Sequence, residues 1–178
     1  MAKNYPTEKD LIDACLSQDR QAQFELFERY KVAMFNVIFR ISNDYDQAND
    51  VLQEGFIEVF RHLKSFRRDS AIGAWIKTIM IRKALKNTKA QVVFEELNEE
   101  IITNELMLDQ WIDAETLDLA IRSLPGSSRA VFVLFEIEGY SHEEISKLLN
   151  VTIGTSKSQL HYAKKLLQTK LSKNYSSK

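Results

Sequence analysis

Apolar side chains recur every three or four residues along most of the chain, and this spacing predicts amphipathic helices rather than strands. The first helix is expected to begin at Thr7, because Asp10 lies three residues later and completes an acidic variant of the capping box. Three more helices are expected, from about Phe24 to Ser42, over 46–63 and over 71–89. The residues assigned to the buried faces of the last two are Val51, Leu52, Phe56, Val59, Phe60 and Leu63, then Ile72, Trp75, Ile76, Ile79, Met80 and Leu85.

A second run of helical spacing predicts another helical domain over 113–172. Within it, Pro125 stands where a helix would start and Gly139 where that helix would end. Between the two runs, residues 91–112 mix acidic and apolar side chains without any Gly or Pro. This segment could be an amphipathic stretch that docks elsewhere or a partly ordered linker, and we favour the linker. The predicted fold class is all-α, with two small helical domains, 7–90 and 113–172, joined by an acidic linker.

The second domain contains the pattern of a helix-turn-helix. Ser141 and Glu144 form a capping box ahead of a short helix, Asn150 and Val151 make a tight connection, and Thr152 can cap the helix that follows. The stripe expected to face inward on that second helix is Ser156, Leu160, Ala163 and Leu167. The side chains expected to face outward are Thr155, Lys157, Ser158, Gln159, His161, Tyr162, Lys164 and Lys165. Polar groups of this kind reach the phosphates and base edges of DNA.

Composition narrows the class of protein. Hydrophobic residues make up 44% of the chain and charged residues 28%, which is the balance of a soluble globular protein. The N-terminus lacks the apolar core of a signal peptide, and no apolar run is long enough to span a membrane. Cys15 is the only cysteine, so an internal disulfide is impossible and a reducing cytoplasm is expected. We see no nucleophile–base pair, phosphate-binding glycine loop or metal-ligand set, and expect no catalytic residue, cofactor or metal.

The net charge of −1 hides an uneven distribution. Residues 61–90 carry nine basic and one acidic side chain, and residues 141–178 carry seven basic and two acidic. Residues 91–120 carry nine acidic side chains and no basic one. Two basic blocks separated by an acidic block predict two surfaces that bind a polyanion.

The whole pattern resembles a known family. The stretch "LPGSSRAVFVLFEIEGYSHEEISKLLNVTIGTSKSQLHYAKKLL" resembles region 4 of the extracytoplasmic-function (ECF) group of the sigma-70 family. The stretch "YDQANDVLQEGFIEVFRHLKSFRRDSAIGAWIKTIMIRKALKN" resembles region 2 of the same family. The two lie in the family's order and the resemblance covers roughly residues 10–170. It implies that 7–90 binds core RNA polymerase and the promoter −10 element, and that 113–172 binds the −35 element.

Candidate contacts carry over from the family position by position. The resemblance implies core polymerase contacts at Asp50, Gln53, Glu54 and Phe56. It implies −10 contacts at Arg67, Arg68, Lys77, Arg82, Lys83, Lys86 and Asn87, with an unpaired base held near the "FRRDSAIG" loop. It implies −35 contacts at Thr155, Lys157, Ser158, Gln159, His161, Tyr162 and Lys165. Trp75 is expected to be a core residue rather than a base-stacking one.

The chain departs from the family pattern at three positions. Many relatives carry an aromatic residue at Ile72 and Asn at Arg82, and these two differences bear on the −10 preference. Many carry Arg at Tyr162, so a charge that would meet phosphate is absent there. None of the three alters the expected fold.

The resemblance implies a transcription initiation factor without catalysis of its own. Its expected partners are core RNA polymerase, promoter DNA and an anti-sigma protein, with no small-molecule substrate and no membrane insertion. One alternative is a stand-alone helix-turn-helix regulator, which would dimerise on a palindrome rather than join polymerase one to one. A second is a helical adaptor whose basic faces bind acidic protein, which predicts no salt-sensitive binding to DNA.

Overall fold

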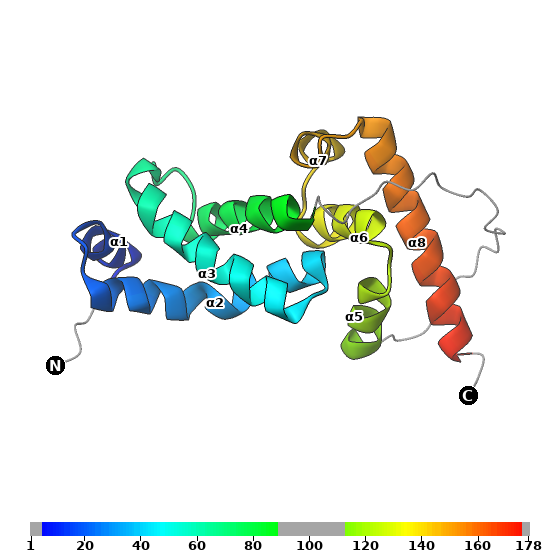
Figure 1. Ribbon diagram of the computed structural model, residues 1–178, viewed down its shortest axis with the longest axis horizontal. Coiled ribbons are helices and arrows are strands. Elements are labelled where there is room, and N and C mark those ends of the chain that lie inside the picture. Colours follow the sequence, from blue (N-terminus) through cyan, green and yellow to red (C-terminus); the bar gives the residue numbers. More distant parts are fainter. Residues whose placement is uncertain (1–4, 89–112, 176–178) are drawn as a thin grey trace. The chain divides into compact units, whose positions relative to one another are not determined.

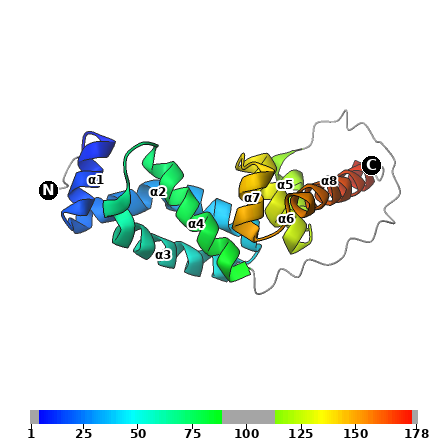
Figure 2. The ribbon, with the colours of Figure 1, turned by 90° about the horizontal axis from the view of Figure 1, so that it is seen from above.

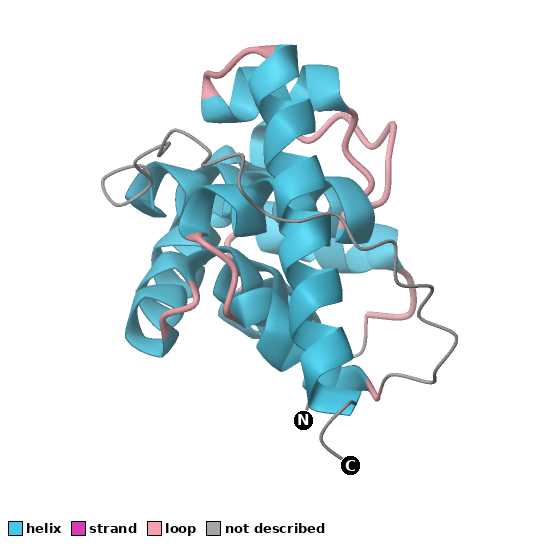
Figure 3. Cartoon of the chain, turned by 90° about the vertical axis from the view of Figure 1, so that its right-hand side faces the viewer, coloured by secondary structure: helices cyan, strands magenta, loops and turns pink. Residues whose placement is uncertain are grey.

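The computed structural model describes residues 5–88 and 113–175, the side chains of 173–175 excepted. Contacts divide the chain into two compact units, Met1–Asn87 and Thr88–Lys178. The described residues form helices and connecting turns without a β-strand, as Figure 3 shows, and this confirms the all-α prediction. The predicted acidic linker, 91–112, lies outside the described residues. No helix of the described segments combines the length and the apolar character that crossing a membrane requires.

Polar side chains set the helix ends of the first unit. The unit consists of α1 (Glu8–Leu16), α2 (Arg20–Ser42), α3 (Tyr45–His62), the 3₁₀ turn η1 (Leu63–Ser65) and α4 (Ile72–Thr88), shown in Figure 1. The predicted capping box between Thr7 and Asp10 is present. Asn43, in the left-handed conformation, ends α2, and Asp44 accepts a hydrogen bond from an N–H of the first turn of α3. These two residues form the whole turn, and α2 and α3 pack against each other on either side of it (Figure 2).

The core of the first unit is aliphatic, with an aromatic cluster beside it. Leu26 and Ile38 of α2 and Val51 of α3 are fully buried. Burial of each such side chain contributes about 1.5–3 kcal/mol to folding. The ring of Phe56 meets that of Phe27 edge-on at 4.9 Å between centroids. Gly55 of α3 faces the thioether of Met80, and a β-carbon at Gly55 would collide with it, so the absence of a side chain at Gly55 lets Met80 of α4 lie against α3 here.

The second unit is built around one long helix. It contains α5 (Ala114–Arg122), α6 (Gly126–Phe132), the π-helical turn η2 (Val133–Ile137), α7 (His142–Leu149) and α8 (Ile153–Tyr175), and α5, α6 and α7 each contact α8. Pro125 directly precedes α6, and Gly139, with a φ of 76°, follows the end of η2, which confirms the predicted start and end of this helical stretch. The guanidinium of Arg129 is buried and donates to the carbonyls of Arg122 and Leu124, joining α6 to the end of α5.

Candidate nucleic-acid interface

A helix-turn-helix is formed by α7, the turn at 150–152 and α8. The predicted capping box is present, because the Ser141 hydroxyl accepts from the N–H of Glu144 and the Glu144 carboxylate accepts from the N–H of Ser141. Asn150 adopts the left-handed conformation that ends α7. The side chain of Thr152 accepts from the N–H of Thr155 at 2.9 Å and so caps α8, as predicted. The caps at Ser141, Asn150 and Thr152 therefore fix where α7 begins and ends and where α8 begins.

The inward face of α8 follows the predicted stripe. Ser156 and Ala163 are fully buried, and Leu160 and Leu167 are 7% and 6% exposed. The small side chains at 156 and 163 keep the neighbouring helices close to the backbone of α8. This packing fixes which face of α8 meets solvent.

The outward face of α8 carries most of the predicted −35 contacts. Lys157, Ser158 and His161 are exposed, whereas Thr155, Tyr162 and Lys165 are half-exposed. Lys164, also predicted to face outward, is exposed and pairs with Glu136 of η2 at 2.7 Å. The exposed side chains thus present cations, a hydroxyl and an imidazole along one side of the helix.

The predicted outward position of Gln159 is wrong. Its side chain is 3% exposed, and its amide oxygen accepts a 2.6 Å hydrogen bond from the hydroxyl of Ser128 in α6, which is also buried. Position 159 lies three residues after the buried Ser156, so the helix turns it toward α6. Gln159 therefore joins α6 to α8 inside the unit.

His142 belongs to the same structure although no sequence pattern marked it. Its Nδ1 lies 2.9 Å from the hydroxyl of Ser156, and its ring stacks on Phe135 with centroids 4.4 Å apart. Partial burial, with the nearby charge of Lys157, lowers the pKa of His142 below its ordinary value. The imidazole thus connects the start of α7 to the first turn of α8.

The basic residues of the first unit are placed around the start and the outer side of α4. Arg67 is 86% exposed and lies 3.5 Å from Asp69, while Arg68 pairs with Asp13 of α1. On α4 the predicted −10 contacts differ in exposure: Arg82 and Lys86 are exposed, and Lys77, Lys83 and Asn87 are half-buried. Trp75, predicted to be a core residue, is half-buried, and its ring centroid lies 5.4 Å from that of Phe66.

The α3 face predicted to meet polymerase is only partly available. Asp50, Gln53 and Glu54 are exposed on α3. Phe56, also predicted as a polymerase contact, is 3% exposed and packs on Phe27 and Phe60, so its side chain does not lie on this exposed face. The helical period gives the reason, since Phe56 lies four residues after the buried Leu52 and on the same inward face.

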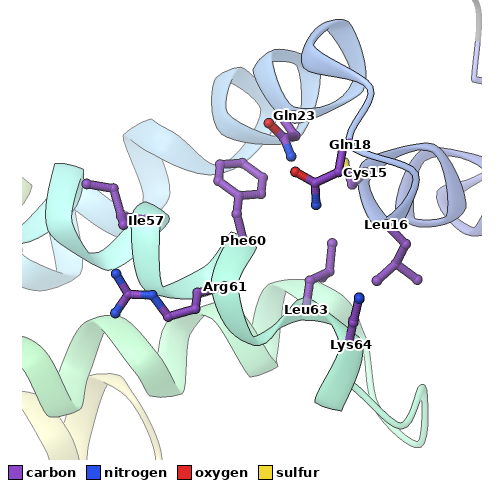
Figure 4. Close-up of a pocket in the computed structure, with 9 residues that line it drawn as sticks. All are labelled: Cys15, Leu16, Gln18, Gln23, Ile57, Phe60, Arg61, Leu63 and Lys64. Carbon is purple, nitrogen blue, oxygen red and sulfur yellow. The ribbon is translucent and has the colours of Figure 1, made fainter.

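A cavity of about 460 Å³ lies where α1, α2 and the end of α3 meet (Figure 4). Its lining is mixed in character: Cys15, Leu16, Gln18, Gln23, Ile57, Phe60, Arg61, Leu63 and Lys64. Burial, with the charge of Asp19 nearby, raises the pKa of the Cys15 thiol to about 11. The thiol is therefore a packed apolar group at neutral pH rather than a nucleophile.

Comparison with known proteins gives the class to which this arrangement belongs. Residues 26–92 match the family described as sigma-70 region 2, and residues 114–167 match sigma-70, region 4. Over 186 residues the chain is 31% identical to the ECF RNA polymerase sigma factor SigE of Mycolicibacterium smegmatis, covering 96% of this chain and 70% of that protein. It is also 28% identical to the RNA polymerase sigma-H factor of Pseudomonas aeruginosa, covering 92% of this chain and 93% of that one.

The chain belongs to the ECF group of sigma-70 family RNA polymerase sigma factors, which are DNA-binding proteins of promoter-directed transcription initiation. The fold agrees with solved structures. The sigma factor RpoE of Bartonella quintana, solved with the anti-sigma factor NepR, has a TM-score of 0.55 at 20% identity and covers 83% of this chain. The structure of CnrH in complex with the cytosolic domain of CnrY has a TM-score of 0.52 at 20% identity and covers 91%.

Proposed function

We propose that the chain joins core RNA polymerase one to one through α3 and directs it to promoters with two DNA-reading surfaces. The domains assigned to these tasks are 7–90 for polymerase and the −10 element and 113–172 for the −35 element. The observation that carries the proposal is the helix-turn-helix, because α8 is capped, packed on one side and exposed on the other. The protein itself supplies binding and no catalysis; the polymerase performs the chemistry.

The −35 reader is the exposed face of α8. Its first two turns carry Thr155, Lys157 and Ser158, and its third carries His161 and Tyr162. A helix that enters the major groove by its N-terminal end places such residues at base edges and phosphates. Lys157, exposed and near the start of the helix, is the cation best placed for a phosphate, and Lys165, about two turns beyond it, is the second. Gln159 lies beneath this surface, where its hydrogen bond to Ser128 holds α8 against α6, and it does not touch DNA.

The −10 reader is α4 with the loop before it. Arg82 and Lys86 are exposed at i and i+4 on α4, so both cations point to the same side of the helix. Arg67 in the preceding loop is 86% exposed, whereas the neighbouring Arg68 is 37% exposed. Lys77 and Asn87 complete the proposed surface. Cations aligned along one helix neutralise strand phosphates and give binding that weakens steeply with salt.

Core polymerase is proposed to dock on the polar positions Asp50, Gln53 and Glu54 of α3. They lie at i, i+3 and i+4, so they share one helical face, and all three are exposed. An anti-sigma protein is proposed as the inhibitory partner, because the sigma factor RpoE of Bartonella quintana, which has this fold, was solved with the anti-sigma factor NepR. The proposed site of action is the cytoplasm, where polymerase and chromosome lie.

The proposal is tested by binding stoichiometry with purified bacterial core polymerase. Analytical ultracentrifugation should show a one-to-one complex, and that complex should bind promoter fragments with an affinity that falls as salt rises. The isolated chain at physiological salt should bind the same fragments poorly, because its DNA surfaces are small and separate. A homodimer that binds a palindrome and ignores polymerase would instead identify a stand-alone regulator.

A further inference from the structure

Lys83 of α4 contacts the helix proposed to dock on polymerase. Its ammonium nitrogen lies 3.1 Å from a carboxylate oxygen of Glu54 and 3.5 Å from one of Glu58, both on α3. The Lys83 side chain is 21% exposed, whereas those of Glu54 and Glu58 are 59% and 42% exposed. One largely covered cation thus holds two carboxylates that both reach solvent.

The packing of the two helices explains this arrangement. Gly55 lets α4 come close to α3, with Met80 filling the space that a side chain at Gly55 would occupy. Lys83 stands three residues after Met80, on the same side of α4, so its chain runs along α3. Glu54 and Glu58 flank Gly55 at i and i+4, where two like charges repel each other unless a cation lies between them.

We infer that Lys83 is a positioning residue of the polymerase-docking helix and not a contact to DNA. Its ammonium group offsets the repulsion between the two glutamates and holds the Glu54 carboxylate in one orientation on the exposed face of α3. A group that is already oriented loses less conformational freedom when a partner binds. The inference rests on the proposed function, since it assigns Lys83 to the core polymerase interface proposed above.

The position of Lys83 separates it from the other cations of α4. Arg82 and Lys86 are exposed, and the structure gives neither of them a carboxylate partner among the ion pairs of the described residues. A DNA phosphate would have to displace the Glu54 and Glu58 carboxylates before it could pair with the Lys83 ammonium group. Lys83 should therefore add little to the salt dependence of DNA binding.

The test compares Lys83→Met with three matched variants of the full chain. Lys83→Arg keeps the charge, Lys86→Met removes an exposed charge from the same helix, and Lys9→Met removes one from α1 as a control for net charge. Affinity for core polymerase is measured by fluorescence titration. The salt slope of promoter binding is then measured for each reconstituted holoenzyme, and thermal unfolding of each free chain shows whether the fold is intact.

Lys83→Met is expected to weaken association with core polymerase about threefold to fivefold, within the range for a partly exposed ion pair. Lys83→Arg should retain the wild-type affinity. Glu54→Gln combined with Lys83→Met should weaken association by less than the product of the two single effects, because both changes remove the same contact. Lys86→Met should reduce the salt slope by about one while Lys83→Met leaves it unchanged.

Two results would overturn the inference. If Lys83→Met lowered the salt slope as Lys86→Met does and left polymerase affinity intact, Lys83 would be a DNA contact. If Lys83→Met tightened the polymerase complex, Lys83 would compete with polymerase for the Glu54 carboxylate rather than orient that carboxylate for binding. Failure of the wild-type chain to bind core polymerase at all would reject the proposed function itself, so the two failures are distinguishable.

Discussion

The buried hydrogen bond between Gln159 and Ser128 predicts a stability effect at a position where the family resemblance predicts a DNA contact. Gln159→Leu keeps the approximate length of the side chain but removes the acceptor for the Ser128 hydroxyl, which is 1% exposed. A buried hydroxyl without a partner costs about 1–3 kcal/mol. Serine in a helix can turn its hydroxyl to a carbonyl one turn earlier, so we expect the middle of this range, about 2 kcal/mol.

Hydrogen exchange measures this effect within the second unit of the full chain. A loss of about 2 kcal/mol speeds exchange of amides that open with the unit by roughly 30-fold. The increase should appear in α6 and α8, the two helices that the bond joins. Ser128→Ala added to Gln159→Leu should recover part of the loss, because both partners are then apolar.

Lys157→Ala is the matched control, since Lys157 is exposed on the same helix. It should leave exchange in α6 and α8 unchanged and reduce the salt slope of promoter binding by about one. Unchanged exchange in Gln159→Leu, together with a −35 binding defect like that of Lys157→Ala, would refute the assignment of Gln159 to the interior.

Three further predictions follow from buried or partly buried groups. Phe56→Ala should destabilise the first unit by about 3–5 kcal/mol, measured by urea unfolding, whereas an effect confined to polymerase affinity would contradict its burial. Because folding lowers the pKa of His142, the unfolded chain takes up the imidazole proton first as pH falls, and the second unit should lose stability below about pH 6.5. His142→Asn should remove that part of the pH dependence. An identical pH profile in the variant would contradict the role given to His142. Cys15, with a pKa of about 11, should react with a disulfide reagent at pH 8 about 100-fold more slowly than a free thiol, and reaction at the free-thiol rate would show that it is accessible.

Local signals account for what the sequence predicted well. The capping boxes at Thr7 and Ser141, the turn at Asn150 and the buried stripe beginning at Ser156 all depend on residues close together in the chain. Their hydrogen bonds span three or four residues, so the same side chains that mark them in the sequence form them in the structure. The helical character and the helix-turn-helix were therefore predictable.

The interior placement of individual site residues was not predictable in the same way. Gln159 is buried because Ser128, 31 residues earlier, supplies a donor, and Lys83 is covered because Glu54 and Glu58 reach it across a helix interface. A polar side chain looks the same in sequence whether it meets solvent or a distant partner. His142 escaped notice for this reason too, since both Phe135 and Ser156 lie in other elements.

Run-off transcription with purified core polymerase shows whether the chain directs initiation at specific promoters. Promoter-bearing genomic fragments are transcribed with and without the chain, and the starts of the transcripts are mapped. Specific transcripts are expected only when the chain is present, with common −35 and −10 sequences upstream of their starts. These transcripts should be lost when Lys157 and Arg82 are both replaced by Ala. Absence of chain-dependent transcripts from a polymerase that is active with another sigma factor would contradict the proposed function.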